Sequence, residues 1–552
     1  MRRPLRASIV APLLAVAATA LHPSIGLAQG GPEEGLEQDV GPGRETPPAL
    51  PGDTVLVPQD QPTIQQGVDA AEPGGLVLIA PGVYREAVDV SVPFITIRGV
   101  DRNTTILDGG FQLDSGIHVV EADGVAVENL TARNYLANGF KWSSVFGYRG
   151  SFLTAHNDGA YGLFAFDSVY GQFDHSYASG HPDSGFSIGQ CHPCHAVVAD
   201  VVAENNAIGF RGTNAGGELF IVNSEWSNNM SGIVSNTLDS APLAPQRDAV
   251  IAGNWVHDNN NADAPAGSLE YPSLGIGIAV NGGRTNLVTQ NLVEDHVNFG
   301  IALLPSPDAR LTERNEVRRN VVRRSGDADL ALGAPAAGGD CFDANEFTTS
   351  LPVAIEWRHG CSAWLGSAPG GSIGVTTGPL ARRLQARGAV ESGDWRTQPE
   401  PPPQDTMPGA EQAPPNPASI GAVPQRVQIR DARTLEVPAS DDVSREVTVL
   451  GLSLGAGFFG VLIGLYAYAL PLILYAAWVS VALWDLARQD AVPNGVRIGW
   501  MAAVLAVPVI GPVAYYAFGR SPIQRSLRVM LVAGGLAIYV VLAAIGVALG
   551  AA

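Results

Sequence analysis

The sequence predicts an all-β right-handed parallel β-helix, a solenoid, followed by an α-helical transmembrane domain. Three observations lead to this prediction. Glycines recur at a nearly constant interval, short runs of Val, Phe and Ile alternate with Asn, Asp and Gly turns, and the composition becomes strongly apolar from Val447 onward. At 552 residues the chain is too long for one hydrophobic core, so separate domains are expected.

The N-terminus has the three parts of a secretory signal peptide. Arginines within the first six residues precede an apolar run over 9–20, and Gly26 and Ala28 are the small residues of a cleavage site. A signal anchor that remains attached is the alternative. We expect a signal peptide over 1–28 and, because Gly, Pro and Glu dominate the next segment, a disordered spacer over 29–52.

The repeat is defined by glycines 23 or 24 residues apart, with one double interval of 45 residues: Gly139, Gly162, Gly185, Gly209, Gly232, Gly277 and Gly300. The residue after each glycine is large and apolar: Phe140, Leu163, Phe186, Phe210, Ile233, Ile278 and Ile301. The residue four positions before each glycine can form hydrogen bonds: Tyr135, Asp158, His181, Asn205, Asn228, Ser273 and His296. Such columns are typical of a coil of constant circumference, with apolar residues stacked inside about 4.8 Å apart and polar residues at a turn.

Other repeat architectures fit less well. A 23-residue unit is too short for a strand plus a helix of ordinary length, and the regular leucines of a leucine-rich horseshoe are missing. A solenoid needs capped ends, and residues 62–72 can form a short amphipathic helix over the first coil. We expect the β-helix domain to span 53–365.

The start of this domain carries a family resemblance. The run TIQQGVDAAEPGGLVLIAPGVYREAVDV, the later ITIRGVDRNTTILDGG and the N-x-x-G-I/F turns resemble the bacterial pectate-lyase-like superfamily of β-helix repeat proteins over about residues 53–345. Members of that superfamily bind or process polysaccharides or serve as periplasmic accessory proteins. The resemblance implies the fold, whereas a fold alone does not specify an activity.

A lyase or epimerase of this fold would need a base for the proton next to a uronate carboxylate. The candidate catalytic residues are Asp158, His181, Asp183, Asp174 and His175. Because all three residues stand four positions before a repeated glycine, Asp158 is expected below His181 and Asn205 above it. Asp158 and His181 then form either an acid–base pair or part of a hydrogen-bonded ladder that closes the turns. Glu204 with Asp158 is a candidate Ca²⁺ site. The Asp-Pro-His-Asp signature of alginate epimerases is absent.

The four cysteines form two close pairs, and export permits disulfides. Residues 191–195, Cys-His-Pro-Cys-His, match the C-x-x-C-H signature of covalent haem attachment, and a Cys/His metal site is a further alternative. A local disulfide between Cys191 and Cys194 is favoured because flanking strands leave no room for a porphyrin. Cys341 and Cys361 are expected to fasten the C-terminal cap.

Eight prolines between 399 and 417 predict an extended stalk within a linker over 366–446. The apolar region 447–552 predicts about four membrane spans, at 447–468, 471–487, 498–518 and 527–550. Four spans put the arginines at 520, 525 and 528 on the cytoplasmic side, whereas three would put them outside. We expect a multi-pass protein of the cell membrane with an extracytoplasmic β-helix.

Residues 471–520 resemble the phospholipase D-nuclease N-terminal domain, the two-helix module that precedes the catalytic part of cardiolipin synthases. The resemblance is carried by the run from Trp478 to Arg488 and by the Pro-x-x-Gly-Pro…Gly-Arg run that ends at Arg520. Those enzymes need two His-x-Lys motifs, and the only lysine here is Lys141, which follows Phe140. The resemblance therefore implies an anchor or docking module and not a phospholipase D or cardiolipin synthase.

The charge balance, 33 basic against 53 acidic side chains, provides no basic stripe for phosphates and excludes a nucleic-acid partner. The leading hypothesis is a membrane-anchored, exported protein of the cell envelope that binds polysaccharide, with a lyase, epimerase or hydrolase activity as the possible chemistry. The rivals are a non-catalytic structural or interaction protein and an accessory factor for metal or haem handling.

Overall fold

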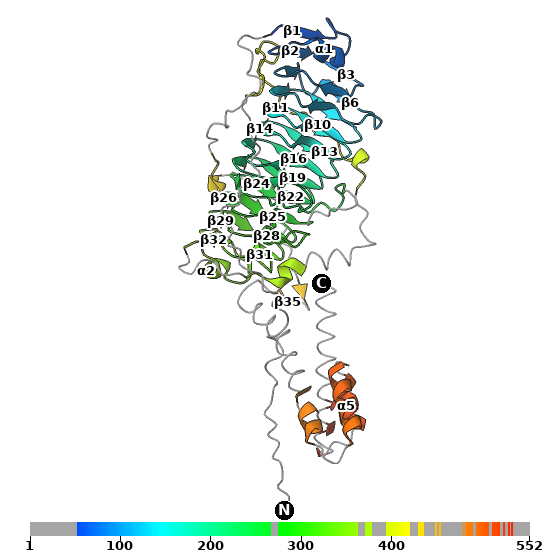
Figure 1. Cartoon of the computed structure of the whole chain (residues 1–552), viewed down its shortest axis with the longest axis vertical. Helices are drawn as coiled ribbons and strands as arrows, with labels where there is room; N and C mark the ends of the chain where they lie inside the picture. Colours follow the sequence, from blue (N-terminus) through cyan, green and yellow to red (C-terminus); the bar gives the residue numbers. More distant parts are fainter. Residues whose placement is uncertain are drawn as a thin grey trace, which may run out of the picture. The chain divides into compact units, whose positions relative to one another are not determined.

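The computed structural model describes residues 52–266, 274–362, 370–377, 393–419 and 429–434, together with short stretches between 448 and 533. The predicted signal peptide and spacer, and Ser273, lie outside the described residues. The chain divides into two compact units, residues 1–436 and 437–552. Figure 1 shows the first unit as a stack of coils in sequence order.

The first unit is a right-handed β-helix made of three parallel sheets. Sheet A contains β1 (Thr54–Val57), β2 (Leu76–Ile79), β5 (Thr96–Gly99), β8 (Val125–Glu128), β11 (Phe146–Ser151), β14 (Val169–Asp174), β17 (Ala196–Ala199), β20 (Leu219–Val222), β23 (Ala249–Ala252), β26 (Leu287–Thr289), β29 (Glu316–Arg318) and β32 (Cys341–Asp343). Sheet B contains β3 (Gly82–Tyr84), β6 (Thr105–Asp108), β9 (Thr131–Arg133), β12 (Thr154–His156), β15 (Tyr177–Ser179), β18 (Val202–Glu204), β21 (Glu225–Ser227), β24 (Trp255–His257), β27 (Leu292–Glu294) and β30 (Val321–Arg323). Sheet C contains β4 (Val88–Val90), β7 (Ile117–Val120), β10 (Asn138–Ser143), β13 (Tyr161–Phe166), β16 (Ser184–Cys191), β19 (Ile208–Ala215), β22 (Ser231–Asn236), β25 (Ile276–Asn281), β28 (Phe299–Leu304), β31 (Ala328–Leu332) and β33 (Ser350–Leu351).

Each complete coil contributes one strand to each sheet in the order A, B, C, whereas the first and last coils are incomplete. We call the turns between the strands the A/B, B/C and C/A corners. The predicted apolar column is confirmed: Phe140, Leu163, Phe186, Phe210, Ile233, Ile278 and Ile301 pair in successive registers of sheet C and are fully buried. The repeated glycines stack beside this column. A Cβ on Gly162, for example, would lie 2.5 Å from the carbonyl oxygen of Gly185, so the coils can be this close only without a side chain there.

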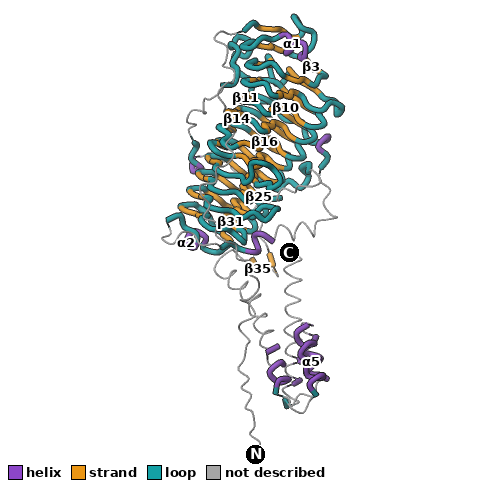
Figure 2. The backbone as a smooth tube through the Cα atoms, viewed as in Figure 1, coloured by secondary structure: helices purple, strands orange, loops and turns teal. Residues whose placement is uncertain are grey.

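Both ends of the solenoid are capped (Figure 2). Helix α1 (Ile64–Ala70) is capped by Thr63, whose hydroxyl accepts the Gln66 N–H, and it buries Ile64 and Val68 over the first coil as predicted. Helix α2 (Ile355–Arg358) covers the last coil with the buried Ile355. The disulfide between Cys341 and Cys361 is confirmed and ties α2 to β32.

The proline-rich segment lies along the solenoid, although the sequence predicts a stalk. Asn157 at a B/C corner donates to the carbonyl oxygen of Gln398, and Gln404 exchanges hydrogen bonds with Asn103 at an A/B corner. Further on, Arg98 of β5 donates to the carbonyl oxygens of residues 410, 413 and 414. An extended proline-rich chain leaves its carbonyls unpaired, so side chains of the coils can bind them. We call residues 393–418 the belt.

The second unit contains the hairpin of β34 (Thr448–Val449) and β35 (Leu452–Ser453) and the helices α5 (Asn494–Ala506) and α6 (Ile510–Phe518). Here Tyr515 donates to the buried carboxylate of Asp485 at 2.6 Å. None of the helices that the structure describes is long and apolar enough to cross a bilayer. The transmembrane domain therefore stays a prediction.

Candidate functional site

Asp158 and His181 lie inside the solenoid at consecutive B/C corners, as the repeat phase predicts. His181 Nε2 is 3.2 Å from Asp158 Oδ2, and Asp158 Oδ1 accepts the backbone N–H of Tyr135 at 2.9 Å. Both side chains are fully buried. Burial raises the pKa of Asp158 to about 6, although the hydrogen bond from His181 opposes this change. A polymer outside the solenoid cannot reach either group.

The residue above His181 is Asn206, so the predicted position of Asn205 is wrong. Asn206 Oδ1 accepts the His181 N–H at 3.0 Å, and Asn229 Oδ1 in turn accepts the Asn206 N–H at the same distance. Four residues separate β15 from β16, but only three separate β18 from β19. The inward-facing residue of the second turn is therefore three positions before the repeated glycine, and not four as in the first turn. Asn205 instead occupies the turn with φ of 59°. This arrangement matches the structural alternative, a ladder that closes the turns.

Asp174 and His175 lie at an A/B corner, on a different side of the coil from Asp183. His175 Nδ1 is 2.7 Å from Asp174 Oδ2, and its ring stacks on Phe152 with 4.6 Å between centroids. The hydrogen bond to Asp174 raises the pKa of His175. The Ser151 hydroxyl also donates to this carboxylate, so the pair is held within the corner.

Glu204 lies on the outer face of sheet B and accepts the Tyr177 hydroxyl at 2.5 Å. Asp158 is inside the coil, so the two carboxylates predicted to share a Ca²⁺ ion face different environments. Within the described ranges no group of three or more His, Cys, Asp or Glu side chains is arranged to hold a metal ion.

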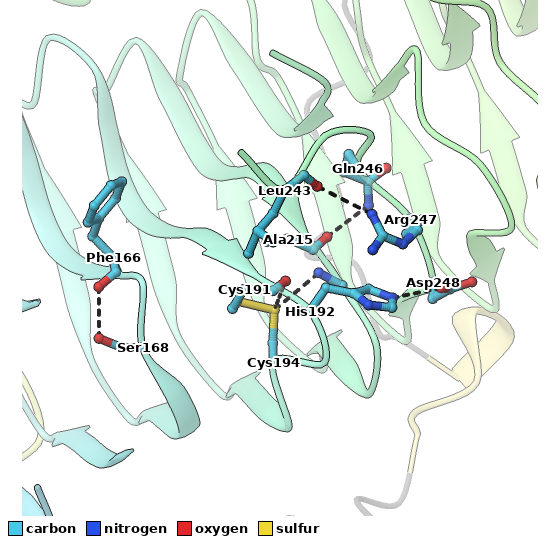
Figure 3. The surroundings of a disulfide bond; sticks show 11 residues. Phe166, Ser168, Cys191, His192, Cys194, Ala215, Leu243, Gln246, Arg247 and Asp248 are labelled. Carbon is cyan, nitrogen blue, oxygen red and sulfur yellow. Dashed lines mark hydrogen bonds and ion pairs between the residues drawn. A yellow bond between two sulfur atoms is a disulfide. The ribbon is translucent and has the colours of Figure 1, made fainter. Parts of the chain in front are cut away.

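Cys191 and Cys194 form a disulfide at a C/A corner (Figure 3), as predicted. Both residues are fully buried, and Cys194 Sγ accepts the N–H of Gly216. His192 Nε2 lies 2.9 Å from Asp248 Oδ2. The two thiols that covalent haem attachment would require are thus joined to each other. The corner between Cys191 and Ala196 is one residue longer than the corresponding corner of the next coil, because Cys191 pairs with Ala215 and Ala196 pairs with Leu219.

Asp183 is the predicted site residue that lies on the outer face of sheet C. Its Oδ1 accepts the Arg211 guanidinium at 2.7 Å, and its Oδ2 accepts the Tyr161 hydroxyl at 2.9 Å. Arg211 belongs to β19 and Tyr161 to β13, so this carboxylate joins neighbouring coils across the face.

Strand β13 presents three aromatic rings beside this carboxylate. Tyr161 stacks on Phe164 with 4.3 Å between centroids, and Phe164 is 5.9 Å from Phe166, whose side chain is 42% exposed. We call these three residues the aromatic strip. It crosses the face from the B/C corner, where β13 begins, toward the C/A corner, where β13 ends.

Lys141 is the register neighbour of Phe164, and its Nζ lies 6.0 Å from the centre of that ring. No ion pair joins Lys141 to a carboxylate in the part of the chain that the structure describes. His118 lies one coil below Lys141. Burial, together with the charge of Lys141, lowers the pKa of His118, so its ring is neutral at pH 7. Lys141, the aromatic strip, Asp183 and Arg211 together form what we call the sheet C site.

The described segments outside the coils contact other faces of the solenoid. The belt passes from the B/C corner around sheets B and A, and its last contact is the Ala418 N–H with the carbonyl oxygen of Gly124 at a C/A corner. The later coils of sheet C carry an apolar outer cluster that includes Ile276 and Phe299 and packs against Val375. Among the described residues, neither the belt nor this apolar cluster includes Lys141.

Sequence reasoning missed Lys141, Tyr161, Phe164 and Arg211, although the signal was present. Positions 118, 141, 164, 187 and 211 repeat at the same interval as the glycines and form one outward column. The inward columns are easy to recognise because each contains residues of one polarity, whereas the outward column contains charged, aromatic and small polar residues in successive coils.

Comparison with known proteins supports the fold. The right-handed β-helix family model matches residues 102–322, and the phospholipase D-nuclease N-terminal model matches residues 476–520. No curated protein matches the sequence. Among solved structures, the A-module of mannuronan C-5 epimerase AlgE4 from Azotobacter vinelandii shares 14% identity over 51% of this chain and 90% of its own, with a TM-score of 0.34. An alginate lyase from Paenibacillus shares 13% identity over 54% and 99%, with a TM-score of 0.35. At these values the likeness carries no argument about activity, which depends on the side chains of this chain.

Proposed function

We propose that this protein binds an anionic polysaccharide on the outer face of sheet C. The observation that carries the proposal is Lys141, a cation that forms no ion pair with the described residues and lies beside the half-buried ring of Phe164, in a chain with a formal net charge of −20. A cation beside aromatic surfaces suits an acidic sugar, because rings pack against the apolar face of a sugar while the charge binds its carboxylate. The belt supports the proposal because it contacts sheet A at Arg98 and reaches the B/C corner at Asn157.

The site suits recognition better than bond cleavage. Both oxygens of Asp183 already accept hydrogen bonds, from Arg211 and from Tyr161. These two contacts give the carboxylate a structural role, because they join it to strands of the neighbouring coils. We therefore propose binding as the function, with chemistry on the polymer as a separate outcome of the same assay.

We also propose that the chain is exported and anchored in the cell membrane by its second unit. Two observations support this: the N-terminal pattern of a secretory signal and the apolar composition after Val447. The match of residues 476–520 to the phospholipase D-nuclease N-terminal model is consistent with an anchoring module. Fractionation of cells, followed by protease treatment of intact cells, tests this part; recovery of the protein in the soluble cytoplasmic fraction would contradict it.

Binding to sodium polygalacturonate, with neutral dextran as the comparison polymer, tests the proposed ligand class. Lys141→Ala should weaken binding to the acidic polymer roughly tenfold, which corresponds to about 1.4 kcal/mol, the scale of one charged hydrogen bond. Arg318→Ala is the matched control because Arg318 is 41% exposed on the outer face of sheet A, away from the site. Equal binding of both polymers, or equal loss in the two variants, would refute the proposal. Ultraviolet absorbance of unsaturated product, recorded in parallel, reports lyase activity.

A further inference from the structure

The belt begins at the B/C corner beside the sheet C site. Gly393 pairs with Pro265 in a parallel bridge, and Gln398 Nε2 donates to the carbonyl oxygen of Asp263 at 3.2 Å. Asn157 Nδ2 donates to the carbonyl oxygen of Gln398 at 3.1 Å. These contacts hold the 3-10 turn η1 (Trp395–Thr397) in a defined place on this corner, and Figure 1 shows the yellow turn beside β13.

Trp395 continues the row of rings that β13 starts. Its ring meets Phe111 edge-on with 5.4 Å between centroids. It also lies against Gly159, because a Cβ on that glycine would come within 3.2 Å of Trp395 Cζ2. Gly159 is two residues before Tyr161, the first residue of the aromatic strip. The belt thus places an aromatic ring at the corner, two residues before the strand that carries the aromatic strip.

Arg396 is held on this extension. Its guanidinium carbon lies 4.3 Å from the centre of the Trp395 ring, and its side chain is 47% exposed. Its ionic partner is Asp394, whose Oδ1 is 3.7 Å from Nη1 and also accepts the Arg396 N–H at 3.0 Å. An exposed pair at this separation contributes little, so an incoming carboxylate can take its place. A guanidinium stacked on an aromatic ring keeps its planar fork free to bind a carboxylate.

We propose that the bound polymer crosses the solenoid along the aromatic strip and that Arg396 of the belt is the second cation that binds it. This inference rests on the proposed function of the sheet C site and adds the direction of the ligand and a positioning role for Trp395. An acidic sugar beside Lys141 would be followed by sugars over Phe164 and Tyr161, and a further acidic sugar would meet Arg396. The docked belt is then part of the binding surface.

The chain contains a matched control for Arg396. The sequence Asp-Trp-Arg-Thr of residues 394–397 recurs as Asp-Ala-Arg-Thr in residues 431–434. The second copy forms the 3-10 turn η2 (Ala432–Thr434), in which Asp431 Oδ1 accepts the Arg433 N–H at 3.1 Å. Arg433 is 58% exposed and lies 3.6 Å from a Glu346 carboxylate oxygen. The two arginines share local turn, charge and exposure, but η2 has alanine in place of tryptophan and contacts a coil near the other end of the solenoid.

The test measures binding of the full-length protein to immobilised sodium polygalacturonate. Arg396→Ala should weaken binding about fivefold to tenfold and Arg433→Ala less than about twofold. Arg396→Lys should fall between, because lysine keeps the charge but loses the planar fork. Equal effects of Arg396→Ala and Arg433→Ala, with Lys141→Ala still weakening binding, would overturn this inference and leave the proposed function standing. No effect of Lys141→Ala would overturn both.

Hydrogen exchange of the belt checks that the variants remain docked. The amide of Met407 donates to Asn129 Oδ1 and the amide of Asn416 to Thr96 Oγ1, so both should stay protected. If Arg396→Ala releases the belt, the Arg396→Gln variant tests whether the charge of Arg396 binds the polymer. Glutamine keeps a planar polar group on the Trp395 ring but lacks the charge. Weakened binding in Arg396→Gln with a protected belt supports the inference, and unchanged binding overturns it.

Discussion

The inner and outer sides of the B/C corner use similar side chains for different purposes. On the inner side, Asp158, His181 and Asn206 bond to one another and to backbone N–H groups, and all three are buried. On the outer side, Asp183 bonds to Arg211 and Tyr161, which come from the two neighbouring coils. Similar polar side chains thus close the turns inside the coil and join neighbouring coils outside it, and burial distinguishes the two groups.

The largest expected effect breaks the inner ladder. Asn206→Leu keeps the volume but removes the acceptor of the His181 N–H and the donors to the carbonyl oxygens of Ala178 and Glu204. We expect the free energy of unfolding to fall by about 4 kcal/mol, because several buried polar groups lose their partners. Urea unfolding measures this. Asn205→Gly is the control and should be nearly neutral because its turn φ of 59° suits glycine. Comparable losses in the two variants would contradict the assignment of Asn206 to the ladder.

The belt buries part of the outer face of sheet A, so polar side chains on this face are paired as completely as those inside the coil. Arg98 on sheet A is fully buried, pairs with Glu128 at 2.6 Å and donates to belt carbonyls. Arg98→Ala leaves Glu128 with Arg149 as its remaining partner, so we expect a loss of about 3 kcal/mol together with faster hydrogen exchange at Met407 and Asn416. Unchanged exchange in the belt would show that Arg98 does not hold it.

His296, at the end of the ladder, should make stability depend on pH. Burial lowers the pKa of His296 to about 3, whereas the unfolded residue titrates near its ordinary value of 6.5. The unfolded chain therefore binds a proton as pH falls below 6.5 while the folded chain does not, so stability is lost toward acid. His296→Asn should remove about 2 kcal/mol of the difference in unfolding free energy between pH 6.5 and pH 4.5.

His175 provides the opposite case for the same measurement. Its pKa is raised by the hydrogen bond with Asp174, so its contribution to stability is present at low pH and is lost as pH rises. His175→Asn should therefore make the loss of stability toward acid steeper and not shallower. The same sign of change in His296→Asn and His175→Asn would contradict this account.

The smallest expected effect on stability is at the aromatic strip. Phe164→Ala removes a ring that is part-exposed on the outer face, so the free energy of unfolding should fall by less than about 1 kcal/mol. Binding to polygalacturonate should nevertheless weaken severalfold, because the ring next to Lys141 is lost. A loss of stability as large as that of Asn206→Leu would mean that the strip is part of the core and not a ligand surface.

The solenoid, both disulfides and the N-terminal helical cap could be predicted from residue patterns, because these features depend on a constant period and on neighbours close in the chain. Residues such as Phe186 and Phe210 keep the phase of their strands and therefore stack. The position of Asn206 could not be read in the same way. Asn206 lies two residues after the end of β18, as His181 lies two residues after the end of β15. The turn between β18 and β19 is one residue shorter than the turn between β15 and β16, so counting back four positions from Gly209 gives Asn205 instead.

Only the tertiary structure decided which polar residues are available to a ligand. Asp158 and Asp183 both lie at B/C corners, but the side chain of Asp158 is buried inside the coil and that of Asp183 bonds to Arg211 on the outer side. The docking of the belt could not be predicted from the sequence either, because its contacts join residues about 300 positions apart, as between Arg98 and Pro414. Contacts of that kind follow from the path of the whole chain in space, which no local period or motif encodes.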